Sequence, residues 1–294
     1  MPTLTRPRLA RTHRPRPIAR DAQSLPNSLA LELGFTMPDD GNALTSLAGL
    51  DIGQKTDVGR VREANEDALL TLPRPAGAAD RWLVAVADGM GGHKAGEVAS
   101  ALAVEALRAS AEGAGAETMS NRFLTAAVEL ANRNIWNAAA DDVEKEGMGT
   151  TLVCAVVSAD GAVAIANVGD SRAYLVTDAS ARLVTIDHTW VNQQVLDGQL
   201  SESEARMSPY RNLLTRSLGS TPRVQADLFE DVQLEPGHAL VLVSDGVSGY
   251  LDEVDVAAIV RSSESAQEAA DRLVTEAVER GGADNATAVV VRRV

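Results

Sequence analysis

The stretch Trp82-Leu-Val-Ala-Val-Ala-Asp-Gly-Met-Gly-Gly-His-Lys-Ala-Gly-Glu97 joins an apolar run to a glycine-rich loop and then to an alanine-rich segment. The apolar run predicts a buried strand, and the alanines that follow predict a helix. Asp88 stands at the end of the strand, directly before Gly89. Asp-Gly after a strand is also a common turn, so this pair alone does not decide between a turn and a ligand.

Three further aspartates stand at the ends of apolar runs. Asp170 follows residues 163–169, Asp245 follows residues 239–244, and Asp284 precedes residues 286–291. Carboxylates at the ends of core strands are costly to cluster unless cations neutralise them. If the strand ends converge, we therefore expect divalent metal ions among them and a site suited to phosphate chemistry. For Asp170 alone, a turn residue and a ligand remain equal alternatives.

These aspartates belong to an ordered set of short motifs. The motifs are Gly59-Arg-Val-Arg-Glu-Ala-Asn-Glu-Asp67, Asp88-Gly-Met-Gly-Gly, Gly149-Thr-Thr, Gly169-Asp-Ser-Arg-Ala-Tyr174, Ser244-Asp-Gly246 and Asp284-Asn-Ala-Thr287. In this order and at these separations they resemble the metal-dependent protein phosphatases of the PP2C (PPM) family, in particular the bacterial Ser/Thr phosphatases. The resemblance covers residues 51–294.

Hydrophobic patterns along the chain predict an α+β protein. Helices are predicted over 97–111, 121–140, 252–262 and 265–280, and a last strand over 286–291. Runs of β-branched residues between 150 and 176 predict antiparallel strands joined by turns such as Ala159-Asp-Gly161. Helices in pairs and strands in meanders favour a layered sandwich over a doubly wound sheet. The resemblance implies a four-layer αββα sandwich, with two antiparallel β-sheets flanked by helix pairs and the active site at one edge.

The same residues suggest a metal centre. Asp88, Asp245 and Asp284 are the candidate ligands, and the Gly89 carbonyl is a further one that the resemblance also implies. Asp170 resembles the ligand of a third, weaker site shared with Asp245. Oxygen ligands favour Mg²⁺ or Mn²⁺ over zinc, with two or three ions in total. Two such ions activate a water for attack on phosphorus and offset charge on the transferring oxygens.

Two residues of the first motif are candidates for catalysis. Arg62 is the candidate phosphate clamp, because a planar guanidinium can bind two phosphate oxygens at once. Its alternative is an exposed arginine at the start of a strand. Glu66 is expected to act through coordinated water. For protonation of the leaving group, His93 and metal-bound water remain alternatives, and His93 is also a candidate cap of the following helix.

Other chemistries fit less well. The loop from Asp88 to Gly96 matches neither GxGxxG nor GxxxxGK[ST], so nucleotide-loop motifs are absent there. The single cysteine, Cys154, lies in an apolar run and predicts a buried thiol. A cysteine-dependent phosphatase needs an arginine six residues later, where this chain has Asp160.

Charge divides the chain of 294 residues into two parts. Residues 1–20 contain six arginines and no acidic residue, whereas the net charge of the whole chain is −14, so residues 51–294 are strongly acidic. We predict an Arg/Pro-rich disordered extension over residues 1–48 and a phosphatase domain over residues 49–294. An acidic body argues against general nucleic-acid binding. With no apolar run of about 18 residues, we expect a cytoplasmic protein without a membrane span.

Three functions follow as hypotheses. The first is a Mg²⁺- or Mn²⁺-dependent phosphatase that acts as a monomer on phosphoserine and phosphothreonine in proteins and opposes a bacterial Ser/Thr kinase. The second is a pseudophosphatase that binds phosphoproteins without turnover, but the retention of all four aspartates and Arg62 argues against it. The third is a metallophosphatase for small phosphomonoesters.

Overall fold

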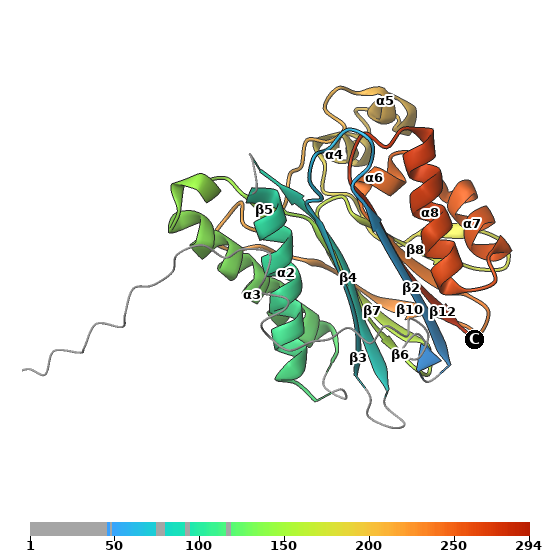
Figure 1. Ribbon diagram of the computed structural model, residues 1–294. Helices are drawn as coiled ribbons and strands as arrows, with labels where there is room; N and C mark the ends of the chain where they lie inside the picture. The colour runs from blue at the N-terminus through green and yellow to red at the C-terminus, as the bar shows by residue number, and fades with distance from the viewer. Residues whose placement is uncertain (1–45, 48, 75–79, 92–94, 116–118) are drawn as a thin grey trace, which may run out of the picture. The chain divides into compact units, whose positions relative to one another are not determined.

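The computed structural model describes residues 46–47, 49–74, 80–91, 95–115 and 119–294 (Figure 1). In these ranges the strands form two antiparallel sheets. The first sheet has the order β1 (Ser46–Leu47), β2 (Leu50–Asp57), β12 (Ala286–Arg293), β11 (Ala239–Val243), β8 (Arg172–Val176) and β9 (Ala181–Leu183). The second has the order β10 (Asp227–Gln233), β7 (Ala162–Val168), β6 (Leu152–Ser158), β4 (Arg81–Met90) and β3 (Asp67–Arg74), with β5 (Gly149–Thr150) paired to the end of β4.

Side chains alternate between two cores along the central strands. In β4, Trp82, Val84 and Val86 enter a core between the two sheets, whereas Leu83 and Ala85 enter a core beneath helices. This follows from the two-residue period of a strand, which sends successive side chains to opposite faces. A strand that is apolar on both faces therefore lies in the middle of a layered structure.

Pairs of helices cover the outer faces of the sheets (Figure 1). The helices α2 (Ala95–Glu112) and α3 (Asn121–Ala140) pack on the second sheet, and α7 (Glu253–Ser262) and α8 (Ala266–Arg280) pack on the first. Alanines such as Ala99 and Ala103 of α2 are buried, and their small side chains let the helix lie close to β4. The predicted αββα sandwich and all four predicted helices are confirmed, with ends shifted by two residues or fewer.

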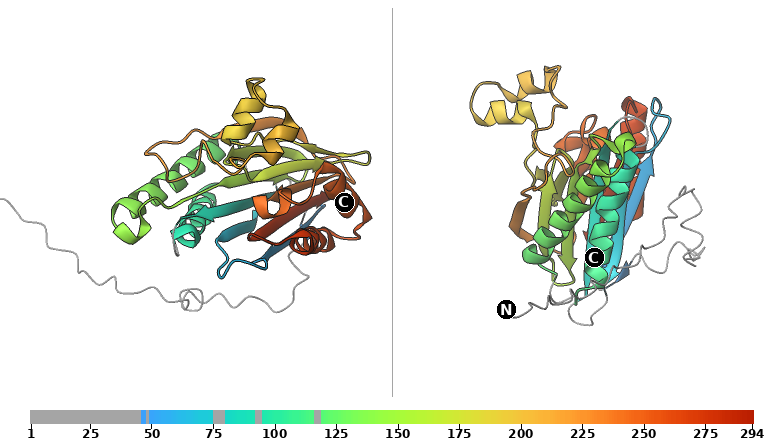
Figure 2. Two further views of the ribbon diagram at one scale, coloured as in Figure 1. Left: turned by 90° about the horizontal axis from the view of Figure 1, so that it is seen from above. Right: turned by 90° about the vertical axis from the view of Figure 1, so that its left-hand side faces the viewer.

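The segment between β9 and β10 stands away from the layers. It contains the short helices α4 (Trp190–Leu196) and α5 (Glu202–Met207), drawn in gold at the top of Figure 1 and beyond the edge of the sandwich in Figure 2. Trp190 and Tyr210 pack edge to face on this segment, with ring centroids 5.6 Å apart. A strand-like bridge between Thr189 and Leu214 lies within this segment, and a second bridge, between Thr150 of β5 and Leu218, joins the segment to the second sheet.

One connection differs from a simple meander. The strands predicted between 150 and 176 do form, but β8 leaves its neighbour β7 and pairs with β11 and β9 in the other sheet. The chain crosses at Gly169, whose φ of 106° is in the region that favours glycine. Strand propensity is local and does not choose the partner strand, so this crossing was not predicted.

A short helix, α6 (Asp245–Ser248), directly follows β11. Two predictions fall on residues that the structure does not describe, namely His93 and the N-terminal extension apart from residues 46 and 47. Among the helices of the described ranges, none combines the length and the apolar character that crossing a bilayer requires.

Candidate metal centre

The structure brings the four predicted aspartates together from separate segments. Asp88 lies in β4, Asp170 follows β7, Asp245 is the first residue of α6, and Asp284 precedes β12. Asp88 interacts electrostatically with both Asp170 and Asp245, and Asp245 interacts with Asp284. Segments up to about two hundred residues apart in the chain therefore place their carboxylates in one cluster.

Burial and mutual repulsion raise the pKa values of three of these carboxyl groups, those of Asp88, Asp170 and Asp245. Burial is the main cause for Asp88, whose pKa lies well above its usual value, and the charges of Asp67 and Asp245 add to the effect. The pKa of Asp170 is raised to about 7 by burial and then by Asp245. Asp245 shows a raised pKa for the same reason, with Asp284 as its main neighbour. Raised values mean that the cluster favours protons or cations over bare negative charge.

Asp67 is a member of this cluster that sequence reasoning missed. It begins β3 and pairs directly with Asp88 of β4. Its Oδ2 accepts hydrogen bonds from Ser244 Oγ at 2.8 Å and from Thr287 Oγ1 at 2.6 Å, both in or beside strands of the other sheet. Burial raises its pKa to about 7. Asp67 thus links the two sheets next to the other aspartates. Its place in the cluster depends on the register of β3 on β4, which the sequence did not predict.

Arg62 and Glu66 lie on the loop between β2 and β3. Arg62 donates from Nη2 to Asp284 Oδ2 at 2.7 Å, and its Nη1 lies 3.9 Å from Glu66 Oε2. The Arg62 side chain is 47% exposed, whereas that of Glu66 is 13% exposed. Burial raises the pKa of Glu66, and the nearby Arg62 opposes that shift. The loop therefore presents one accessible cation and one sheltered carboxylate beside Asp284.

Asn285 holds this loop in place. Its Oδ1 accepts a hydrogen bond from the Glu66 amide at 2.8 Å, and its Nδ2 donates to the carbonyls of Val58 and Ala64 at 2.9 Å each. Since Asn285 follows Asp284 directly, one side chain ties the loop of Arg62 and Glu66 to the start of β12. This buried amide was not singled out from the sequence.

Gly89 and Gly96 let three segments approach closely. A Cβ atom at Gly89 would lie 2.2 Å from the carbonyl oxygen of Gly96, and one at Gly96 would lie 2.9 Å from Cδ of Glu66. The Gly89 amide also donates to the Glu66 carbonyl at 3.1 Å. Glycine is thus required here by contact with neighbouring atoms, and the first turn of α2 forms a wall against Glu66.

Replacing Gly96 tests this contact. For the phosphatase activity that the resemblance implies, Gly96→Ala is expected to lower phosphate release by about 100-fold, because a displacement of about 1 Å near the reacting groups costs that much. The measurement is the turnover of a phosphothreonine peptide, with circular dichroism to verify folding. The matched control is Gly113→Ala after the other end of α2, where a Cβ meets atoms no closer than 3.7 Å. Equal activity of the two variants would contradict the proposed wall.

The loop of Asp170 is braced by buried polar side chains. Thr151 Oγ1 lies 2.7 Å from Ser171 Oγ and accepts from the Asp88 amide at 3.0 Å. On the other side, the Gly169 amide donates to His188 Nδ1 at 3.0 Å. His188 Nε2 in turn lies 3.1 Å from Asp227 Oδ2. Asp170 therefore occupies a defined position next to Asp88.

The donor set fits a hard divalent cation. The side-chain atoms of the aspartate cluster that could bind a metal ion are all carboxylate oxygens. One of them, Oδ1 of Asp67, is buried without a hydrogen-bond partner. In the described ranges, no three acidic, cysteine or histidine side chains are already arranged to hold one ion. The charges of Asp88 and Asp245 repel each other, and Asp284 accepts a hydrogen bond from Arg62. The aspartates therefore form a negatively charged cluster that a cation can neutralise, but their side chains are not arranged in a complete coordination sphere.

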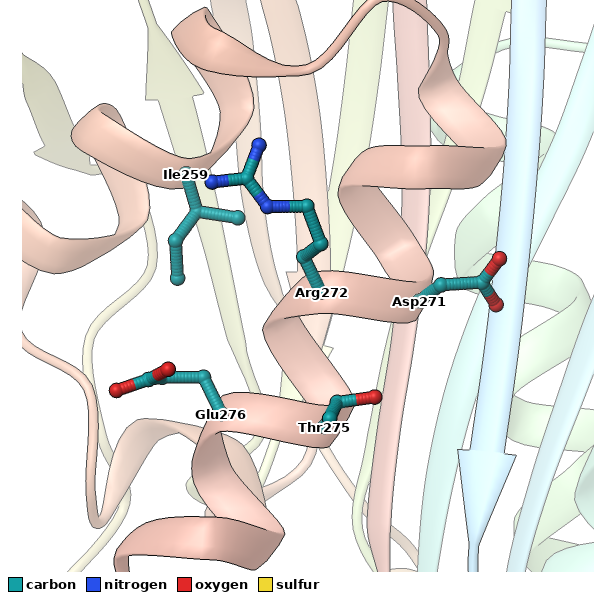
Figure 3. Close-up of a pocket in the computed structure, with 5 residues that line it drawn as sticks. All are labelled: Ile259, Asp271, Arg272, Thr275 and Glu276. Carbon is teal, nitrogen blue, oxygen red and sulfur yellow. The ribbon is translucent and has the colours of Figure 1, made fainter.

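A hollow between α7 and α8 is separate from this centre. It is lined by Ile259, Asp271, Arg272, Thr275 and Glu276 (Figure 3). Arg272, its main cation, donates from Nη1 to Ser263 Oγ at 3.1 Å and pairs with Glu268. The charged side chains of Asp271, Arg272 and Glu276 have partners of their own, so we assign the hollow no role.

Comparison with known proteins agrees with the fold and the motifs. A family model described as Protein phosphatase 2C matches residues 60–286. The serine/threonine phosphatase Stp of Listeria welshimeri is 37% identical over 242 residues, which cover 81% of this chain and 94% of that protein. Protein phosphatase PhpP of Streptococcus pneumoniae is 34% identical over 245 residues, 82% of this chain and 97% of that protein.

Solved structures show the same similarity. The Mycobacterium tuberculosis serine/threonine phosphatase PstP/Ppp has a TM-score of 0.74 and 34% identity, covering 83% of this chain and 98% of that one. The catalytic domain of the phosphatase PstP in complex with two manganese ions has a TM-score of 0.70 and 32% identity, covering 83% and 97% of the two chains. With a matching family model, relatives above 30% identity along nearly their whole length and a shared fold, this chain belongs to the protein phosphatase 2C family, whose members depend on metal ions.

Proposed function

We propose that this protein is a metal-dependent phosphatase that hydrolyses phosphoserine and phosphothreonine in proteins. The observation that carries the proposal is the convergence of Asp88, Asp170, Asp245 and Asp284 beside an accessible arginine. The names of the relatives support the same reaction, since those proteins are serine/threonine phosphatases.

We assign the metal ligands as follows. Asp88, Asp245, Asp284 and the Gly89 carbonyl would hold two divalent ions, and Asp170 with Asp245 would hold a third. Mg²⁺ or Mn²⁺ suits these oxygen ligands, and a related phosphatase has been solved with two manganese ions. When bound, the ions activate the attacking water and neutralise negative charge on the phosphate. Asp67 supports these ligands by accepting hydrogen bonds from Ser244, which directly precedes Asp245, and from Thr287, which follows Asp284 in β12.

The remaining roles belong to the loop between β2 and β3. Arg62 binds phosphate oxygens, since its bond to Asp284 uses one of five guanidinium donors and about half of the side chain is accessible. Glu66 is sheltered beside it and orients the attacking water by accepting a hydrogen bond. Asn285 and Gly96 keep both side chains at the aspartates. The acid that protonates the leaving oxygen has no assignment among the described residues.

Wider assignments complete the proposal. We infer that residues 49–294 form the phosphatase domain and residues 1–48 an extension. We also propose that the protein acts as a cytoplasmic monomer on the substrates of a Ser/Thr kinase. The acidic charge of the body supports phosphoproteins rather than nucleic acids as partners.

Phosphate release from a phosphothreonine peptide tests the function. Wild type is expected to turn over with Mn²⁺ and to stop in EDTA, and Asp245→Asn is expected to lose at least about 1,000-fold, which is about 4 kcal/mol of transition-state stabilisation. Asp178→Asn, an exposed aspartate in the turn between β8 and β9, is the control and should match wild type.

Two results would overturn the proposal in different ways. Absence of turnover in folded protein that binds both Mn²⁺ and the phosphopeptide would favour a phosphoprotein-binding pseudoenzyme. Turnover of small phosphomonoesters with none of phosphopeptides would favour a small-molecule phosphatase.

A further inference from the structure

A tyrosine side chain, that of Tyr250, packs against the loop that carries Asp284. This loop, residues 281–284, connects α8 to β12, and the ring of Tyr250 packs directly on its backbone. A Cβ atom at Gly281 would lie 2.3 Å from Cε1 of that ring, and the Ala283 amide donates to Tyr250 Oη at 3.3 Å. Tyr250 therefore contacts the loop at two points just before Asp284.

The backbone of Tyr250 is tied to Asp245. The Gly249 amide donates to the Asp245 carbonyl at 2.7 Å, and the Tyr250 amide donates to the Val247 carbonyl at 3.1 Å. Val247 is fully buried, so this turn is anchored in the core beneath α8. Tyr250 consequently moves as one body with α6, whose first residue is Asp245.

Arg280, directly before the loop, links the end of α8 to Tyr250 and to α7. It donates to the Tyr250 carbonyl at 3.3 Å and to both carboxylate oxygens of Asp255. On the far side, the Arg60 amide donates to the Gly282 carbonyl at 2.7 Å. The 281–284 loop thus lies between Tyr250 on one side and Arg60 on the other. Of these two contacts, the one with Tyr250 connects the loop to the segment that carries Asp245.

We infer that Tyr250 is a positioning residue that sets the place of Asp284 relative to Asp245. Both aspartates interact electrostatically, but they lie on different segments with no direct bond between them among the contacts described. The packing of the Tyr250 ring on the 281–284 loop fixes the separation of the two aspartates that would hold a shared cation. This inference rests on the proposed function, because it takes both aspartates as metal ligands.

Metal affinity of full-length variants tests the inference. Tyr250→Phe keeps the ring and removes the bond from Ala283, so we expect Mn²⁺ to bind about threefold to tenfold more weakly in calorimetric titration. Tyr250→Ala also removes the ring, and we expect a loss of about 10- to 100-fold. Turnover should recover in both variants as the Mn²⁺ concentration rises. Tyr210→Phe, on the exposed surface of the segment between β9 and β10, is the matched control and should bind Mn²⁺ as wild type does.

A double-mutant cycle tests the contact itself. Gly281→Ala places a methyl group against the ring and is expected to weaken Mn²⁺ binding by about tenfold, but much less in the Tyr250→Ala background, where the ring is gone. Additive effects would contradict a direct role for the contact.

The other outcomes separate the two proposals. If wild type binds Mn²⁺ and turns over substrate while folded Tyr250→Phe and Tyr250→Ala keep wild-type Mn²⁺ affinity, Tyr250 only packs and the inference is wrong. If Tyr250→Ala fails to fold, Tyr250→Phe decides alone, and unchanged affinity there overturns it. If wild type itself binds no metal, the proposed function fails first.

Discussion

Asp88→Asn is expected to abolish activity and, in metal-free buffer, to stabilise the protein. Activity should fall at least about 1,000-fold, because the change removes one of the carboxylates proposed to hold the metal ions. Stability should rise by about 2 kcal/mol in EDTA at pH 8, because a buried carboxylate that is repelled by Asp67 and Asp245 becomes a neutral amide. The new amide can still donate to Asp245. Urea unfolding in EDTA and phosphopeptide turnover in Mn²⁺ measure the two effects.

The stabilisation by Asp88→Asn should depend on pH in a way that identifies its cause. A carboxyl group with a raised pKa in the folded state binds its proton more tightly when folded, so unfolding free energy falls as pH rises from the unfolded to the folded pKa. For Asp170 this window runs from 3.8 to about 7, and the full cost is about 4 kcal/mol. The gain from Asp88→Asn should therefore be large at pH 8 and small near pH 4.

Several results would count against this prediction. The control Asp178→Asn should change neither stability nor activity, because its carboxylate is exposed. Saturating Mn²⁺ should stabilise wild type far more than Asp88→Asn. If Asp88→Asn is destabilised in EDTA at pH 8, the aspartates do not repel one another in the way that the structure implies.

Asn285→Ala is expected to have the second largest effect. The change removes three hydrogen bonds to the loop of Arg62 and Glu66 from a side chain that is only 4% exposed. We expect a loss of about 3 kcal/mol in unfolding free energy and of about 100-fold in turnover, since Arg62 and Glu66 lose the contacts that fix their loop. Chemical denaturation and phosphopeptide kinetics at saturating Mn²⁺ measure these changes.

The choice of control separates loop positioning from simple loss of an amide. Asn137→Ala removes an exposed amide from α3 and should change stability by less than about 0.5 kcal/mol. Turnover within about threefold of wild type in Asn285→Ala, despite lower stability, would show that the loop does not depend on Asn285. Asn285→Asp keeps the acceptor for the Glu66 amide but loses both donors, so it should remain nearly as impaired as Asn285→Ala.

Local pattern was enough to predict the secondary structure and much of the candidate site. The helices over 121–140 and 265–280 follow from runs of strong helix formers, and the central strands follow from apolar runs ended by glycine or aspartate. The aspartates at the ends of those runs could be identified because a charged residue next to an apolar run is recognisable from the local sequence alone. Helix pairs and strand meanders also favoured a layered sandwich. The four-layer αββα order, in contrast, followed from the family resemblance, since strand periodicity does not say how sheets stack.

Tertiary structure alone decided which groups meet. No role was predicted from the sequence for Asp67, Asn285 or Tyr250, and each gains its importance from a contact with another segment of the chain. Asp67 meets Thr287 across the two sheets, 220 positions away. Propensity and hydrophobic period act over a few residues, whereas strand register and cross-sheet contacts depend on how the whole core packs. The sequence by itself therefore determined the elements and the chemistry of the aspartates, and packing decided the geometry that lets them act together.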